Sequence, residues 1–329
     1  MGADTLAREG LGRRSFLKLP ALFCAPARKP AIWADDSRGT PFSKDPCVVR
    51  HEGRYLMYYS LMPRPDDPIK AWGIGVAESR DLNAWRKIGE VQPEGEVERK
   101  GICAPGLRRL GGRLHMFYQT YGGGPKDSIC HATSDDGLKW RRNPTNPVFR
   151  VSGDWNCGRV IDAEVIEHNG SLLMLGATRD PAYKTQMLVA ARAPLDSDFG
   201  RASWKQAADY SVLKPELPWE KSCIEAPSMI RRDGRLWCFY AGGYNNEPQQ
   251  VGVAVSDDGV RWTRHSDKPF LPNGSPGDWN ASESGHPCIF EDDDQRTYLF
   301  FQGNNDKGRT WYLSWVEVGW NRTGPFLVG

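Results

Sequence analysis

Three carboxyl side chains and one imidazole are spaced in multiples of about 60 residues, each close to a proline or an alanine. They are Asp45, Asp162, Glu225 and His286. Two neighbouring carboxyl groups can differ in pKa, so that one donates a proton while the other accepts one. Packing alone is a poor reason to gather them, because like charges held together repel and lose hydration. These residues therefore predict an acid/base site, if the fold brings them together.

An internal repeat provides the elements that would position them. Five segments share a polar start, a Pro or Ala, apolar residues, a turn and an aromatic-rich strand. They read KDPCVVRHEGRYLMYYS from Lys44, CAPGLRRLGGRLHMFYQ from Cys103, IDAEVIEHNGSLLMLGA from Ile161, EAPSMIRRDGRLWCFYA from Glu225 and GHPCIFEDDDQRTYLFFQ from Gly285. Alignment of Asp45, Ala104, Asp162, Ala226 and His286 gives intervals of 59, 58, 64 and 60 residues. Each segment predicts two strands joined by a hairpin turn.

A second pattern follows the first at a similar offset. It reads WGIGVAESRDLNAW from Trp72, SICHATSDDGLKW from Ser128 and QVGVAVSDDGVRW from Gln250, with looser copies at 186–204 and 310–320. Each copy predicts an alternating strand, a turn of the Asp-Gly type and a strand that opens on Trp. The repeated tryptophans that follow these turns are expected to pack between units; they are Trp85, Trp140, Trp204 and Trp262.

Each unit of about 60 residues thus carries four short strands, and four-stranded units repeated around an axis form a β-propeller. We predict an all-β fold, a five-bladed β-propeller with each blade a four-stranded antiparallel sheet, over residues 35–329. A solenoid fits less well, because its repeats are usually shorter and lie side by side. Residues 31–44 could close the ring by adding a strand to the last blade. The innermost strands of a propeller line its central channel, so the four side chains should meet at one mouth.

The motifs resemble those of glycoside hydrolase family 43 in order and spacing, over nearly the whole chain past residue 40. They are Asp45-Pro46, Ala104-Pro105, Ile161-Asp162-Ala163, Glu225-Ala226-Pro227 and Gly285-His286. The wider clan of five-bladed glycosidases, including family 32, is similar in layout. Lys44 and Ile161 stand where the invertase pattern has Asn and Arg, which disfavours a fructan substrate. Ala163 and Ala104-Pro105-Gly106 depart from the commoner family 43 residues, which leaves the subfamily open.

The resemblance implies roles for the four residues. Asp45 would be the general base that activates water, Glu225 the general acid, and Asp162 the group that keeps Glu225 protonated and oriented. His286 matches the family's channel histidine, which lies near the base and can help to hold a calcium ion; no other cofactor is implied. The residues alone leave simpler roles open, with Asp45 and Asp162 as turn residues and His286 as a core histidine.

Further side chains are candidates for substrate binding. Two Gly-Asp-Trp copies precede inner strands and could put Trp155 and Trp279 on the substrate side, although packing between blades explains them as well. Arg309 opens the last strand pattern and could contact substrate or the base, or lie on the surface.

The implied activity is hydrolysis of an arabinosyl, xylosyl or galactosyl linkage in a polysaccharide or oligosaccharide, with inversion at the anomeric carbon. One alternative is a retaining glycosidase in which Asp45 is the nucleophile. A glycoside phosphorylase is another, with Arg159 and Lys221 close enough to the motifs to bind phosphate. A non-catalytic carbohydrate-binding propeller is the third, since fold does not dictate function.

Composition narrows the classes of partner. The 329 residues include 43 Lys and Arg against 41 Asp and Glu, a net charge of +2, so no basic excess calls for nucleic acid or an anionic membrane. No apolar run is long enough to span a membrane. The 13 tryptophans suit contact with flat sugar faces. The 8 cysteines form no CxxC pair or Cys/His cluster, which argues against structural zinc, and they are too sparse for a disulfide scaffold.

The N-terminal residues predict where in the cell the protein is sent. Residues 12–18, GRRSFLK, resemble a twin-arginine export motif, and an apolar stretch follows at 19–27. We expect residues 1–34 to be an export signal, with cleavage after Ala27 or Ala34 and a periplasmic or extracellular product. A disordered tail on a cytoplasmic protein is the alternative. Phe23 before Cys24 is too bulky for a lipoprotein signal.

Overall fold

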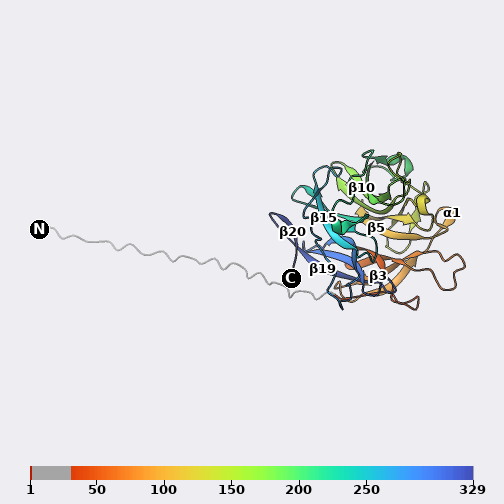
Figure 1. Ribbon diagram of the computed structural model, residues 1–329, viewed down its shortest axis with the longest axis horizontal. Helices are drawn as coiled ribbons and strands as arrows, with labels where there is room; N and C mark the ends of the chain where they lie inside the picture. The colour runs from red at the N-terminus through yellow and green to blue at the C-terminus, as the bar shows by residue number, and fades with distance from the viewer. Residues whose placement is uncertain (2–30, 329) are drawn as a thin grey trace.

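Five four-stranded antiparallel sheets surround a central axis in the computed structural model, which describes residue 1 and residues 31–328 (Figure 1). In each sheet the strands follow one another in chain order, and the first strands of neighbouring sheets contact each other around the axis. The first strand of each blade is therefore the innermost. This arrangement confirms the predicted five-bladed propeller.

The first three blades have the following strands, given from the inside outward. Blade one has β1 (Lys44–His51), β2 (Arg54–Leu61), β3 (Gly73–Ser79) and β4 (Arg86–Val91). Blade two has β5 (Ile102–Leu110), β6 (Arg113–Thr120), β7 (Ile129–Ser134) and β8 (Arg141–Arg142). Blade three has β9 (Ile161–His168), β10 (Ser171–Arg179), β11 (Gln186–Pro194) and β12 (Lys205–Gln206).

The last two blades follow the same order. Blade four has β13 (Ile224–Arg232), β14 (Arg235–Gly242), β15 (Gln250–Ser256) and β16 (Thr263–Arg264). Blade five has β17 (Glu283–Glu291), β18 (Thr297–Asn304), β19 (Tyr312–Asn321) and β20 (Gly324–Leu327). Helical segments are short: α1 (Gly95–Glu98) and the 3-10 turns Gly124–Lys126, Arg201–Ser203 and Pro218–Glu220. Within residues 31–328 no helix is long and apolar enough to cross a membrane.

The Asp-Gly turns form as the sequence predicts. In blade two the carboxylate of Asp136 accepts the backbone N–H groups of Leu138 and Lys139, both at 2.8 Å, and Gly137 takes a positive φ of 77°. Asp258 and Gly259 repeat this arrangement in blade four. A carboxylate that satisfies two turn N–H groups, followed by a residue free to adopt positive φ, fixes the turn before the outermost strand.

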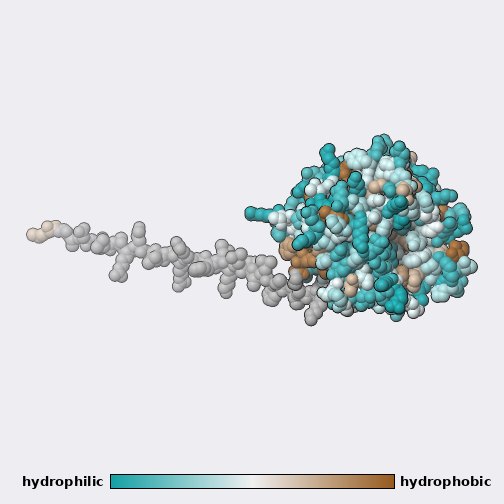
Figure 2. Space-filling view, in the orientation of Figure 1, coloured by the Kyte–Doolittle hydropathy of each residue, from teal (hydrophilic) through white to brown (hydrophobic). Residues whose placement is uncertain are grey.

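Aromatic side chains fill the spaces between blades, and the repeated tryptophans are among them. The ring of Trp140 lies 5.8 Å from that of Tyr58 in the preceding blade, and the ring of Trp204 lies 5.6 Å from that of Phe117. Trp85 packs against the buried cluster that contains Tyr58 and Trp140, and Trp262 packs against a buried cluster of blades three and four. The face shown in Figure 2 is mostly hydrophilic, with small separate hydrophobic patches.

The start of the described chain closes the ring on the last blade. Trp33 pairs with Leu313 of β19 in antiparallel fashion, through N···O distances of 2.9 and 2.7 Å, and Phe42 bridges to Trp311. The same chain then enters β1, the inner strand of blade one. Residues 31–44 thus contact the last blade as expected, but through isolated bridges. The contact includes Trp33, which lies before residue 35, the predicted start of the propeller.

Residues 2–30 of the proposed export signal lie outside the described residues. Export through the twin-arginine motif therefore stays a prediction. The described cysteines are all free thiols; six of the seven are buried and Cys157 is partly exposed.

Candidate active site

One backbone feature recurs at the same place in all five inner strands. The aligned residue adopts a left-handed conformation, although none is a glycine: φ is 55° at Asp45, 46° at Ala104, 54° at Asp162, 49° at Ala226 and 47° at His286. The pairing register with the second strand shifts at this point in each blade. Such a bulge bends the strand and redirects its side chain, here toward the channel that these residues line.

Hydrogen bonds between blades hold three of these kinks. In each, the kinked residue donates its backbone N–H to a side chain on the second strand of the preceding blade. The pairs are Asp45 with Gln302 Oε1 at 2.9 Å, Ala104 with Ser60 Oγ at 2.8 Å, and Asp162 with Gln119 Oε1 at 2.8 Å. A left-handed non-glycine residue costs about 1–3 kcal/mol and persists only where its surroundings constrain it. These bonds therefore fix where Asp45 and Asp162 point.

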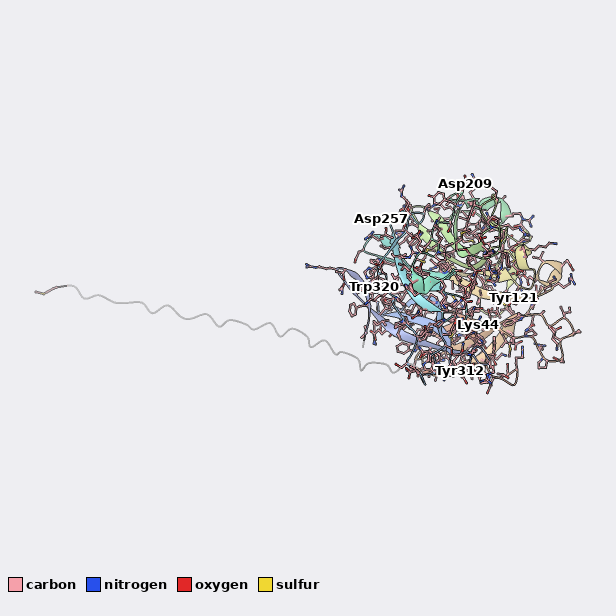
Figure 3. All side chains as sticks on the ribbon, in the orientation of Figure 1. Lys44, Tyr121, Asp209, Asp257, Tyr312 and Trp320 are labelled. Atoms are coloured by element: carbon pink, nitrogen blue, oxygen red, sulfur yellow. The ribbon has the colours of Figure 1, made fainter. Side chains whose placement is uncertain are left out.

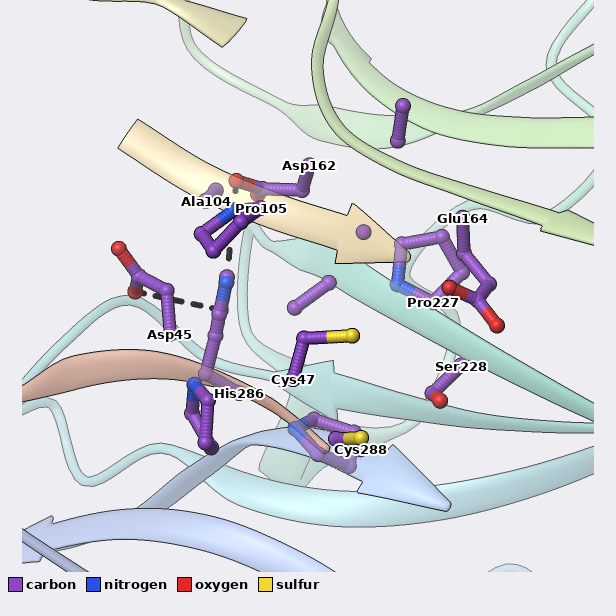
Figure 4. Close-up of a pocket in the computed structure, with 15 residues that line it drawn as sticks. Asp45, Cys47, Ala104, Pro105, Asp162, Glu164, Pro227, Ser228, His286 and Cys288 are labelled. Carbon is purple, nitrogen blue, oxygen red and sulfur yellow. Dashed lines mark ion pairs between the residues drawn. The ribbon is translucent and has the colours of Figure 1, made fainter. Parts of the chain in front are cut away.

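The imidazole of His286 lies between two of the carboxyl groups (Figure 4). Its Nδ1 is 3.3 Å from Asp45 Oδ1 and its Nε2 is 3.8 Å from Asp162 Oδ1. Burial lowers the pKa of His286, more than the charges of Asp45 and Glu225 raise it. The ring is therefore neutral near pH 7, with one nitrogen able to donate a proton and the other able to accept one.

Glu225 reaches the same cavity from one residue earlier in its strand, since Ala226 holds the kinked position. The cavity measures about 170 Å³ and is lined by all four predicted residues, Asp45, Asp162, Glu225 and His286. Glu225 Oε1 accepts an N–H of Gln249 at 2.7 Å, and Oε2 accepts an N–H of Gln186. Two buried amides, one at the start of β11 and one just before β15, thus orient this carboxyl group.

The surroundings of Asp162 shift its pKa strongly. Burial raises its pKa well above the ordinary range, and the negative charges of Glu225 and Asp45 raise it further. Lys44 opposes this from the same wall: although burial acts against its charge, Asp45, Glu283 and Glu225 raise the Lys44 pKa overall. The cavity therefore combines a carboxyl group that retains its proton with groups that remain charged.

The cavity wall also holds residues that the sequence analysis did not single out. They are Lys44, Trp72, Cys103, Gln119, Tyr121, Ile161, Arg179, Gln186, Tyr244, Asn245 and Gln302. Lys44 and Tyr121 lie near the middle of the molecule in the view of Figure 3. Many of these residues lie at or just beyond the ends of second strands. The ends of the second strands all approach the same mouth of the channel. Residues at these ends could therefore have been predicted from the sequence to line the cavity.

Three predicted binding residues do not line this cavity. Trp155 packs against a buried cluster of blades two and three, and the Trp279 ring lies 5.5 Å from that of Phe301. Arg309 is exposed and bonds within its own loop, to the backbone oxygen of Asp306. Of the two cations considered for phosphate, Arg159 lines the cavity, whereas Lys221 bonds to the backbone oxygen of Glu247 away from it.

The calcium expected near His286 stays a prediction. Within residues 31–328 no group of three or more His, Cys, Asp or Glu side chains is arranged to hold a metal ion. His286 is directed at Asp45 and Asp162 instead.

Comparisons with known proteins give a consistent relationship. A family model described as "Glycosyl hydrolases family 43" matches residues 39–322. "Xylosidase/arabinosidase 43A" of Humicola insolens is 32% identical over 93 residues, which cover 28% of this chain and 26% of that protein. "Beta-xylosidase" of Xylanibacter ruminicola is 28% identical over 97 residues, 30% of this chain and 28% of that protein. The chain thus spans under a third of the length of these curated relatives.

Among solved structures, the crystal structure of a thermostable family-43 glycoside hydrolase has the same fold. It aligns with a TM-score of 0.69 and 17% identity, covering 90% of this chain and 96% of that one.

Proposed function

The chain belongs to glycosyl hydrolase family 43, and on that premise we propose that it hydrolyses glycosidic bonds with Asp45, Asp162 and Glu225 as its acidic groups. The observation that carries the proposal is that three blades each direct one carboxyl group into a single cavity. Burying like charges together is unfavourable, so packing does not account for them. Proton transfer to and from a substrate does.

Glu225 donates the proton that the leaving oxygen needs. The amides of Gln186 and Gln249 hold its two oxygens and leave further lone pairs free for a proton. Burial and the negative charges of Glu225 and Asp45 raise the pKa of Asp162, so the acidic cluster retains a proton at a pH where a solvated carboxyl group would have lost it. As the glycosidic C–O bond breaks, Glu225 passes this proton to the departing oxygen.

Asp45 activates the water. The imidazole of His286, with Nδ1 3.3 Å from Asp45 Oδ1, positions the Asp45 carboxylate. Asp45 takes one proton from water while the water oxygen bonds to the anomeric carbon, on the side opposite the leaving group. We propose this direct displacement, which inverts the anomeric configuration and requires room for a water molecule between carboxylate and sugar.

The substrate that we propose is an arabinosyl or xylosyl glycoside, with galactosyl as the third candidate. The names of the two curated relatives support the first two sugars. The cavity of about 170 Å³ is smaller than the roughly 300–1,000 Å³ typical of pockets for drug-sized ligands, and suits a single sugar unit. Trp72, Tyr121 and Tyr244 provide aromatic surface in its wall.

Activity should be measured on nitrophenyl glycosides and on plant oligosaccharides, for the wild type and for Asp45→Asn and Glu225→Gln. Turnover by the wild type, lost in both variants while their folds persist, is the expected result. The first product anomer, followed by NMR, should be inverted. Sugar binding without turnover would identify a non-catalytic propeller, and a retained anomer would assign Asp45 as nucleophile instead.

We also propose that the chain is exported, on the strength of Arg13-Arg14 and the apolar stretch behind them. Replacement of both arginines by lysine should keep the protein in the cytoplasm of an expressing bacterium, as judged by fractionation. Unchanged export of that variant would reject the proposal.

A further inference from the structure

Two arginines of blade three share one acceptor beside the acidic groups. Arg159 Nη1 donates to Gln186 Oε1 at 3.2 Å, and Arg179 Nε donates to the same oxygen at 2.7 Å. The amide nitrogen of Gln186 donates to Glu225. Both guanidinium groups therefore lie one amide away from Glu225, in the wall of the same cavity.

These cations differ from two other largely buried arginines, on the outermost strands of blades two and four, because no ion pair within the described part of the chain joins them to an acidic side chain. In blade two Arg142 pairs with Glu98 at 3.0 Å, and in blade four Arg264 pairs with Glu220 at 2.7 Å. Among residues 31–328, neither Arg159 nor Arg179 forms an ion pair, and Arg159 Nε is buried without a hydrogen-bond partner. Arg159 interacts with the charges of Asp162 and Asp127 only at longer range, so these two partly buried cations lack the direct ion pair that buried charges normally have.

Arg179 is also held in a fixed orientation. Its guanidinium lies 4.4 Å from the ring centre of Tyr183 and 5.0 Å from that of Tyr244. Stacking on aromatic faces leaves the edge of a guanidinium free for in-plane hydrogen bonds. A planar group with two acceptor oxygens is the natural complement of that edge.

We propose that Arg159 and Arg179 bind the carboxylate of a uronosyl unit, so that the substrate is an acidic glycan. This proposal rests on the hydrolase function above and narrows its substrate class. A singly charged carboxylate supplies the missing anion and matches the fork of each guanidinium. A doubly charged phosphate would be opposed more strongly by Asp45, Asp162 and Glu225, which line the same cavity.

Binding should be measured by calorimetry on the intact protein. The first ligand is a xylo-oligosaccharide bearing a glucuronosyl unit, and the second is the same compound with its carboxyl group reduced to an alcohol. We expect about tenfold or greater preference for the acidic form, weakening as salt is added. Arg159→Met and Arg179→Met should each remove most of that preference. Arg261→Gln, at a side chain that is 86% exposed, should retain it.

The deciding quantity is the ratio of the affinities for the acidic and the reduced ligand, measured on the same protein. The ratio for the wild type therefore tests the proposal even if a variant folds poorly. Equal affinity for the acidic and reduced ligands would overturn the proposal, as would tighter binding of inorganic phosphate than of the acidic ligand. Parallel assays on neutral nitrophenyl glycosides separate the two proposals. Turnover without acidic preference rejects the uronate site alone, whereas acidic preference without turnover of any glycoside rejects the hydrolase and supports the site.

Discussion

His286 Nδ1 lies 3.3 Å from Asp45 Oδ1, across the gap between the last blade and the first. The two residues are far apart in sequence, yet both occupy the left-handed position of an inner strand. The geometry makes His286 a positioning residue for the proposed base.

His286→Ala tests this relationship in a backbone that should tolerate the change, because Ala104 and Ala226 occupy the equivalent position in two other blades. Without the imidazole, Asp45 loses the side chain that positions it, and we expect kcat to fall by about 100-fold. Steady-state kinetics and thermal unfolding should be measured together. Full activity in a folded variant would show that Asp45 does not depend on His286.

Glu225→Gln keeps the shape of the side chain but removes its proton. For alkyl and sugar leaving groups, kcat/KM should fall by about 10²–10⁴-fold, because the departing oxygen is no longer protonated. Dinitrophenyl glycosides, whose leaving group needs no proton, should lose much less. Glu96→Gln, at an 82% exposed side chain, is the matched control. An equal loss with both kinds of leaving group would contradict the role of general acid.

Asp162→Asn should change the pH dependence of kcat/KM. The pKa of Asp162 is raised by burial and by Glu225 and Asp45, so in the wild type the acidic cluster releases this proton only at elevated pH. Removal of one negative charge lets the remaining proton leave more easily. The alkaline limb should therefore move to lower pH, by about one unit. An unchanged alkaline limb would separate Asp162 from the proton that reacts.

Asp292→Asn should weaken the junction between blades one and five. Asp292 is buried, accepts the Tyr55 hydroxyl at 2.6 Å and pairs with Arg50 at 2.8 Å. We expect the free energy of unfolding at pH 7 to fall by about 2 kcal/mol, measured by urea denaturation. Asp66→Asn, at an exposed aspartate, should have little effect.

The contribution of Asp292 to the free energy of unfolding should also depend on pH. Burial works against ionisation of Asp292, but hydrogen bonds from Tyr55, the Asp293 N–H and Arg50 lower its pKa overall. A carboxyl group whose pKa is lower in the folded state stabilises the fold above its unfolded value, about 3.9, and this contribution is lost as pH falls through the folded value. The difference between wild type and Asp292→Asn should therefore shrink below about pH 4. A constant difference down to pH 2 would exclude this cause.

The repeat made the fold and the acidic residues predictable, because each blade repeats one pattern of strands and turns. Asp45, Asp162 and His286 could be placed together once the inner strands were known to share an axis. Glu225 aligned one residue off the others. Only the structure shows that Ala226 takes the kinked position while Glu225 projects from the residue before it.

The cavity wall was harder to predict, since the loops differ from blade to blade and carry no repeat. Trp155 and Trp279 looked like sugar-binding residues in their Gly-Asp-Trp contexts, yet both pack against neighbouring aromatic or apolar side chains. Gln186 gave no signal of its own, and Arg179 could be suspected only from its place at the end of β10. Their roles depend on the convergence of β10, β11 and β13 at the channel mouth, which is a property of the tertiary structure.

The bridge between Trp33 and Leu313 has a consequence for the order in which the molecule is built. Its two halves are translated 280 residues apart, so the ring stays open until the fifth blade has been synthesised. The first four blades can form before the fifth, but the ring of inner strands around the axis is complete only when the fifth blade is in place. The candidate active site, which draws Asp45 from the first blade and His286 from the last, is therefore completed only when the fifth blade has folded.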